Sequence, residues 1–83
     1  MAEEFILEVD FNGQKKEFRA WLILRGHSHL FKVMIADKEV FFEPDEEGGY
    51  RAIKMPWQNE KELMKIDKKL LAVIQQKIIE LLQ

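Results

Sequence analysis

The sequence predicts an α+β domain, an antiparallel meander of four to five β-strands with one C-terminal α-helix packed on the sheet. Apolar residues alternate with polar ones over much of residues 5–55, which is the period of a half-buried strand. Short turn-forming pairs separate the alternating runs, and beyond residue 57 the apolar residues take a helical spacing. Short connections favour pairing of neighbouring strands in chain order.

The first two strands are predicted on either side of Asn12-Gly13. Residues 5–11 carry apolar side chains at odd positions, and residues 15–24 resume the alternation. An Asn-Gly pair readily takes the two positive φ angles of a two-residue type I′ turn. Residues 5–24 therefore form a predicted hairpin in which Leu7 faces Phe18.

A second hairpin is predicted after a loop at residues 25–29. Its strands are residues 30–35 and a run that Pro44 ends, because proline has no N–H to give to the ladder. Asp37-Lys38 is the predicted turn between them, so that Val33 faces Phe42. Residues 50–55 form a fifth predicted strand.

The C-terminal part of the chain is predicted to be helical. Asn59 with Glu62 three residues later is typical of a helix start, and Asp67 is a second N-cap candidate. Residues 68–82 form the main predicted helix, which is marginal by itself in water and must dock on the sheet. Its apolar stripe consists of Leu70, Leu71, Ile74, Ile78, Leu81 and Leu82.

The predicted registers place apolar residues on both faces of the sheet. One face would carry Phe5, Leu7, Val9, Phe18, Ala20, Leu22, Leu24, Leu30, Met34 and Phe41. The other would carry Ile6, Trp21, Ile23, Phe31, Val33, Ile35, Val40, Phe42 and Ile53. One helix cannot cover both faces. Three explanations stay open: the sheet curls into a half-barrel, the second face is a homodimer interface, or it binds another partner or ligand.

The leading hypothesis for function is a non-enzymatic protein-interaction or structural module that can self-associate. Its predicted contact surface includes Trp21, Phe31, Val33 or Phe42, and its partner would be another protein or a second copy. Trp57 is expected to pin its connector against the helix. If it is exposed instead, it becomes a candidate interface anchor.

Composition excludes several classes of function. The 83 residues are expected to form one domain, 1–83, with no cysteine for disulfides or thiolate metal sites. Thirteen basic and fifteen acidic residues give a formal charge of −2, and the scattered lysines argue against nucleic acid as a partner. The chain has neither a signal peptide nor a long apolar run, so a cytoplasmic location without membrane contact is expected. No cofactor is predicted.

The acidic loop supports the alternative hypothesis of a small ligand- or cation-binding site at residues 43–51. Its carboxylates offer hard oxygen ligands to calcium or magnesium, but their spacing does not match an EF-hand. A solvated turn is the simpler interpretation, with Arg51 as a clamp on one carboxylate or, alternatively, as a ligand for an anion. The candidate residues are Glu43, Asp45, Glu46, Glu47 and Arg51.

The segment His27-Ser28-His29 contains the only two histidines of the chain. Two imidazoles two residues apart could hold zinc or nickel with a carboxylate, but they are an incomplete ligand set on a predicted turn. Ser28 lacks the strand-turn-helix context of a nucleophile, so no hydrolase is predicted. The glycines form no nucleotide-binding fingerprint.

The run FEPDEEGGYRA, residues 42–52, resembles a segment of small uncharacterised bacterial proteins of this length. Those proteins are similar in layout, with an N-terminal strand, an NG-type turn and a C-terminal helix. The resemblance implies no activity and assigns no site residue.

Overall fold

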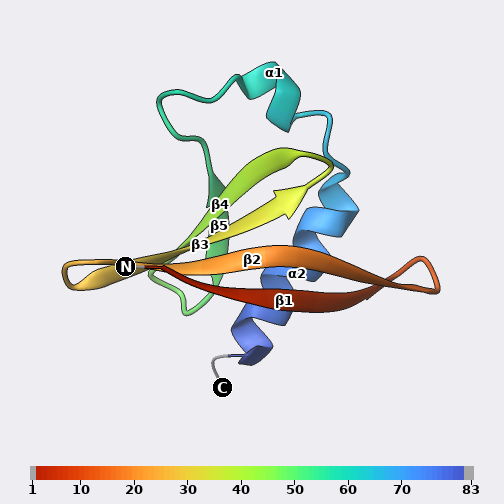
Figure 1. Cartoon of the computed structure of the whole chain (residues 1–83), viewed down its shortest axis with the longest axis horizontal. Coiled ribbons are helices and arrows are strands. Elements are labelled where there is room, and N and C mark those ends of the chain that lie inside the picture. The colour runs from red at the N-terminus through yellow and green to blue at the C-terminus, as the bar shows by residue number, and fades with distance from the viewer. Residues whose placement is uncertain (1, 82–83) are drawn as a thin grey trace.

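The computed structural model, which describes residues 2–81, contains one antiparallel sheet with α2 packed on one face (Figure 1). Its strands follow one another in the order β1-β2-β3-β4-β5. The predicted α+β meander with a C-terminal helix is therefore confirmed. The elements are β1 (Ala2–Phe11), β2 (Gln14–Arg25), β3 (Ser28–Ile35), β4 (Lys38–Pro44), β5 (Tyr50–Ile53), α1 (Glu60–Leu63) and α2 (Lys68–Leu81).

The first hairpin has the predicted register. Leu7 lies opposite Phe18, and Phe11 and Gln14 close a two-residue loop. Asn12 and Gly13 have φ angles of 52° and 74°, the conformation that a type I′ turn requires.

The connection from β2 to β3 is shorter than predicted. Arg25 pairs with Ser28 around a two-residue loop, so Ala20 lies opposite Val33 and Leu22 lies opposite Phe31. The predicted five-residue loop implied a register that differs by one residue. Because side chains alternate between faces, that single step moves every side chain of β3 and β4 to the other face.

The turn between β3 and β4 also differs from the prediction. Ala36 and Asp37 form the loop, with φ angles of 50° and 66°, and Ile35 pairs with Lys38. Val33 therefore faces Val40 and not Phe42. This shift of two residues along the strand leaves the faces unchanged.

The inner face of the sheet and α2 enclose the hydrophobic core. Phe31, Val33 and Phe42 are 3, 0 and 0% exposed within it. The prediction that these three residues belong to a contact surface is therefore wrong, because the corrected register turns them toward α2. The core consists of Leu7, Val9, Ala20, Phe31, Val33, Ile35, Val40 and Phe42 from the sheet, with Ile66, Leu70, Ile74 and Ile78.

Both predicted N-caps are present. The Asn59 side chain accepts a hydrogen bond from the Lys61 amide at 2.9 Å, and Asp67 Oδ1 accepts one from the Lys69 amide at 2.8 Å. Each cap satisfies a backbone donor that has no partner within its helix. On α2 the predicted stripe is buried in the middle, Leu81 is 50% exposed, and Leu82 lies outside the described residues. The fifth strand ends at Ile53, two residues before the predicted limit.

Candidate functional site

The outer face of the sheet, opposite α2, carries a continuous row of large side chains. Each residue of the row lies opposite the next one across adjacent strands. The row runs from β1 to β5 through Glu4, Trp21, Lys32, Phe41 and Ile53. Sequence reasoning placed Phe41 on the other face, because it depended on the incorrect β2–β3 register.

Two cations lie near the ring of Trp21. The Lys32 ammonium is 4.4 Å from the centre of its ring, and the Arg19 guanidinium is 5.0 Å from it. At these distances the negative face of the indole attracts both charges. The indole is consequently half-buried by charged side chains, on the face where it was predicted to lie.

Apolar residues of the outer face form a second, smaller cluster. Leu30 and Phe41 are 6% and 5% exposed although they face away from the core. Ile23 lies opposite Leu30, and the Trp57 ring meets the Phe41 ring edge-on at 6.0 Å. We name Trp21, Ile23, Leu30, Phe41 and Trp57 the outer cluster.

Trp57 covers Phe41 and yet is itself 68% exposed. The expectation that it pins the connector against the helix is not met, since its ring lies on the sheet residue Phe41. A tryptophan with this much free surface beside a packed aromatic neighbour is the kind of residue that dominates protein interfaces.

Four ion pairs lie on the outer face of the sheet. All of them join neighbouring strands, and each acid lies beside a base on the outer face. Such exposed pairs contribute little to stability, about 0.2 to 1 kcal/mol each, but they balance the charge of the surface. The pairs are Glu4–Arg19, Glu8–Lys15, Lys32–Glu39 and Glu43–Arg51.

In the acidic loop, Asp45 organises the backbone. Its Oδ1 accepts hydrogen bonds from the amides of Glu47 and Gly49, both at 2.9 Å. The Asp45 amide also donates to the Gly49 carbonyl at 2.9 Å. One carboxylate oxygen is therefore already occupied by the loop itself, as expected of a structural turn residue.

The five candidate residues of this loop line one open hollow of about 700 Å³, but their carboxylates are not grouped as metal ligands. Arg51 Nε donates to Glu43 Oε1 at 2.7 Å, which matches the predicted clamp, whereas Glu46 and Glu47 are exposed. Among residues 2–81 no three histidine or carboxylate side chains are grouped as ligands of a metal ion. The ion-binding hypothesis thus gains no geometric support from the described chain.

The two histidines lie in different environments. His27 is exposed in the loop, while His29 Nε2 lies 2.6 Å from the hydroxyl oxygen of Tyr50, on the inner face. Burial raises the pKa of the Tyr50 hydroxyl above its ordinary value of 10.0. Ser28 Oγ donates to the Arg25 carbonyl at 3.3 Å, so it has a structural partner. The sequence analysis did not anticipate the His29–Tyr50 contact.

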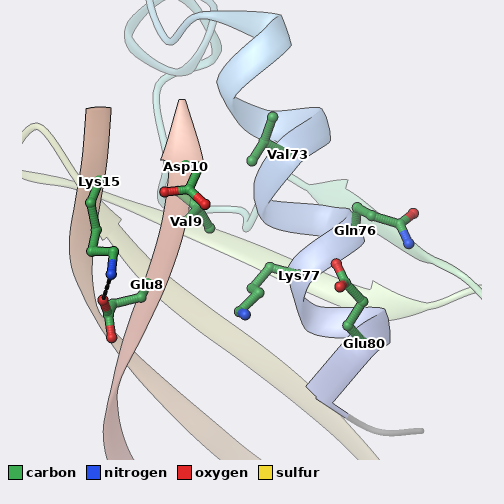
Figure 2. Close-up of a pocket in the computed structure, with 8 residues that line it drawn as sticks. All are labelled: Glu8, Val9, Asp10, Lys15, Val73, Gln76, Lys77 and Glu80. Atoms are coloured by element: carbon green, nitrogen blue, oxygen red, sulfur yellow. Dashed lines mark ion pairs between the residues drawn. The ribbon is translucent and has the colours of Figure 1, made fainter. Parts of the chain in front are cut away.

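A groove lies between β1 and α2 (Figure 2), and the sequence analysis did not predict it. It has a volume of about 490 Å³ and lies along the open edge of the sheet. The first strand of a meander lies at an edge of the sheet, so the predicted strand order already indicated that β1 has an open side. The lining residues are Glu8, Val9, Asp10, Lys15, Val73, Gln76, Lys77 and Glu80.

No family model matches the chain, and neither the curated proteins nor the solved structures contain a match to it. The resemblance of residues 42–52 to small bacterial proteins stays a prediction. Within residues 2–81, no helix combines the length and the apolar character needed to cross a membrane.

Proposed function

We propose that the chain is a non-enzymatic interaction module that self-associates through the outer cluster. The observation that carries this proposal is Trp57, which is 68% exposed while its ring lies against the buried Phe41. Burying an exposed indole on association removes a large apolar surface from water.

The arrangement of charge favours a second copy as the partner. Four ion pairs of the outer face each join an acid to a base, so these charges cancel pair by pair. The paired charges therefore add little repulsion when two such faces meet, and a polar rim around an aromatic centre is the usual anatomy of a protein interface. A twofold axis makes the same patch serve both copies.

Sedimentation equilibrium over a wide range of protein concentration tests the proposal. The wild-type chain is expected to form dimers, and Trp57→Ala is expected to raise the dimer dissociation constant about tenfold or more. Met64→Ala is the matched control, because Met64 is also 68% exposed but lies at the C-terminal end of α1. A chain that stays monomeric at the highest concentration, or a Trp57→Ala variant that dimerises like the wild type, would contradict self-association.

Fluorescence gives an independent readout of the same contact. In a Trp21→Phe variant, Trp57 is the single remaining tryptophan. Its emission is expected to shift to shorter wavelength as the concentration rises, because the indole leaves water in the dimer. Emission that is independent of concentration, in a sample that sediments as a dimer, would place the interface elsewhere.

A further inference from the structure

β1 is a long strand with one side unpaired. It has ten residues and lies at the end of the strand order, whereas the opposite edge strand, β5, has four. Natural proteins usually protect such an edge with charged side chains, above all lysine, or with proline, a bulge or a very short strand. β1 contains neither lysine nor proline and pairs with β2 without a bulge from Ala2 to Phe11, so its protecting charges are carboxylates.

The backbone groups that face outward follow from the hairpin geometry. Phe11 and Gln14 flank a two-residue type I′ loop, so they exchange both hydrogen bonds of their pair. Bonded and non-bonded pairs alternate along an antiparallel ladder. The free N–H and C=O groups of β1 are therefore those of Ala2, Glu4, Ile6, Glu8 and Asp10.

The groove lies where a further strand would have to be placed. Glu8 and Asp10 reach it from the outer face, while Val9 lies on the inner face and Val73 belongs to α2. Residues from both faces line it, so it straddles the edge of β1. Figure 2 shows Lys77 extending from α2 toward β1, with Val73 on the same side of the helix.

From this geometry we propose that the β1–α2 groove binds an extended segment of another protein, added to the sheet as a sixth strand. This is strand addition, in which main-chain hydrogen bonds supply affinity and alternate side chains supply specificity. The surface is distinct from the outer cluster, so the inference goes beyond self-association and does not depend on it.

The charges of β1 favour a basic segment of another protein over a second copy as the occupant. The strand carries the four carboxylates of Glu3, Glu4, Glu8 and Asp10 and no base. No register of two β1 strands can therefore place an acid opposite a base, and like charges directly opposite each other destabilise a sheet. A partner strand that carries lysine or arginine would instead place a base opposite these carboxylates, which stabilises the pairing.

The pattern of the partner follows from the two sides of the groove. Glu4 and Glu8 already pair with Arg19 and Lys15 of β2, whereas Asp10 makes no ion pair within residues 2–81. Basic residues of the partner belong on this outer side. On the helix side the strand meets the apolar side chains of Val9 and Val73, which polar Gln76, Lys77 and Glu80 flank. Apolar residues of the partner belong beside the two valines. The fitting segment alternates basic and apolar residues.

A capped synthetic peptide of alternating lysine and valine tests the proposal, with amide NMR shifts of the isotope-labelled full chain as the readout. Saturable shifts are expected along β1 and in α2 from Val73 to Glu80. A peptide of alternating glutamate and valine is expected to cause no such shifts. A peptide in which lysines and valines form two blocks matches the charge but not the pattern, and weaker binding is expected. No saturable shift with the alternating lysine peptide, or equal binding of the block peptide, would overturn strand addition.

Two variants separate backbone pairing from charge. Ile6→Pro removes an N–H that points away from β2, so the hairpin should fold while peptide binding is lost. Glu8→Gln/Asp10→Asn is expected to weaken binding about fivefold, as removal of two exposed charge contacts predicts. Glu46→Gln/Glu47→Gln makes the same charge change in the acidic loop and should leave the affinity unchanged.

The proposal can still be tested if one of these variants fails to fold. If the Ile6→Pro protein folds and binds the peptide like the wild type, the edge of β1 is not the binding site and the proposal is wrong. Should Ile6→Pro unfold, Glu8→Lys/Asp10→Lys decides, because it is expected to prefer the acidic peptide. Unchanged preference in that variant overturns the proposal. Sedimentation of the same samples reports on self-association separately.

Discussion

Ala20 on β2 lies directly opposite Val33 on β3, and neither side chain has any exposed surface. This pair determines which side chains of β3, β4 and β5 lie on the inner face of the sheet. Ala20 belongs to the face that Leu7 begins, so Val33 and its neighbours at alternate positions join that face and meet α2. A small residue opposite a branched one leaves room for the helix, whose Ile74 is also fully buried.

Two adjacent substitutions test this assignment of faces. Val33→Lys is expected to prevent folding, because an unpaired ammonium in the core costs several kcal/mol. Met34→Lys is expected to fold, because Met34 is half-buried on the outer face opposite Glu39. Circular dichroism and thermal melts of both proteins supply the measurement. A folded Val33→Lys protein would contradict the observed register.

The contact between His29 and Tyr50 predicts a modest loss of stability in Tyr50→Phe. The bond joins β3 to β5, and its atoms are 2.6 Å apart. Removing it should lower the free energy of unfolding by about 0.5 to 1.5 kcal/mol. Urea denaturation gives the value. Ser28→Ala removes an exposed hydroxyl and is the control, for which a smaller effect is expected. If Tyr50→Phe is as stable as the wild type, the contact contributes nothing to stability.

The raised pKa of Tyr50 predicts a stability that falls at alkaline pH. Below pH 10.0 the hydroxyl is protonated in both the folded and the unfolded chain. Above it the unfolded chain releases the proton first, so stability is lost as the pH rises through the folded pKa. Tyr50 is the only tyrosine, so phenolate absorbance in native and urea-unfolded protein reports the two midpoints. A native midpoint at or below the unfolded one would contradict this. Tyr50→Phe should lack this contribution.

Asp45 predicts a structural role for the acidic loop. Asp45→Ala leaves the amides of Glu47 and Gly49 without their acceptor, so a loss of roughly 1 to 2 kcal/mol and faster exchange of both amides are expected. Glu46→Ala changes an exposed carboxylate of the same loop and should have little effect. Amide exchange and urea denaturation measure both quantities. If calcium or magnesium slowed amide exchange in this loop, the ion-binding hypothesis would regain support.

Local patterns in the sequence were sufficient for the element types and for part of the pairing. Asn12-Gly13 specifies its own two-residue loop, because both residues tolerate positive φ, and the first hairpin follows from it. Asn59 and Asp67 mark the helix starts through side chains that bond backbone amides two residues away. These features depend on neighbours in the chain, so a single sequence contains the information for them.

The faces of β3 and β4, and with them the candidate surfaces, were decided only by the tertiary structure. Gly26 has a φ of 56° as the first residue of the two-residue loop, and glycine at this position is typical of a type II′ turn, but the same run is also compatible with the longer loop that was predicted. A one-residue difference there was enough to move Phe31, Val33 and Phe42 from the predicted surface into the core. Which alternative register is adopted depends on the packing of α2 against residues far away in the chain. The sequence therefore determined which segments are strands and helices, while long-range packing decided which side chains remain at the surface.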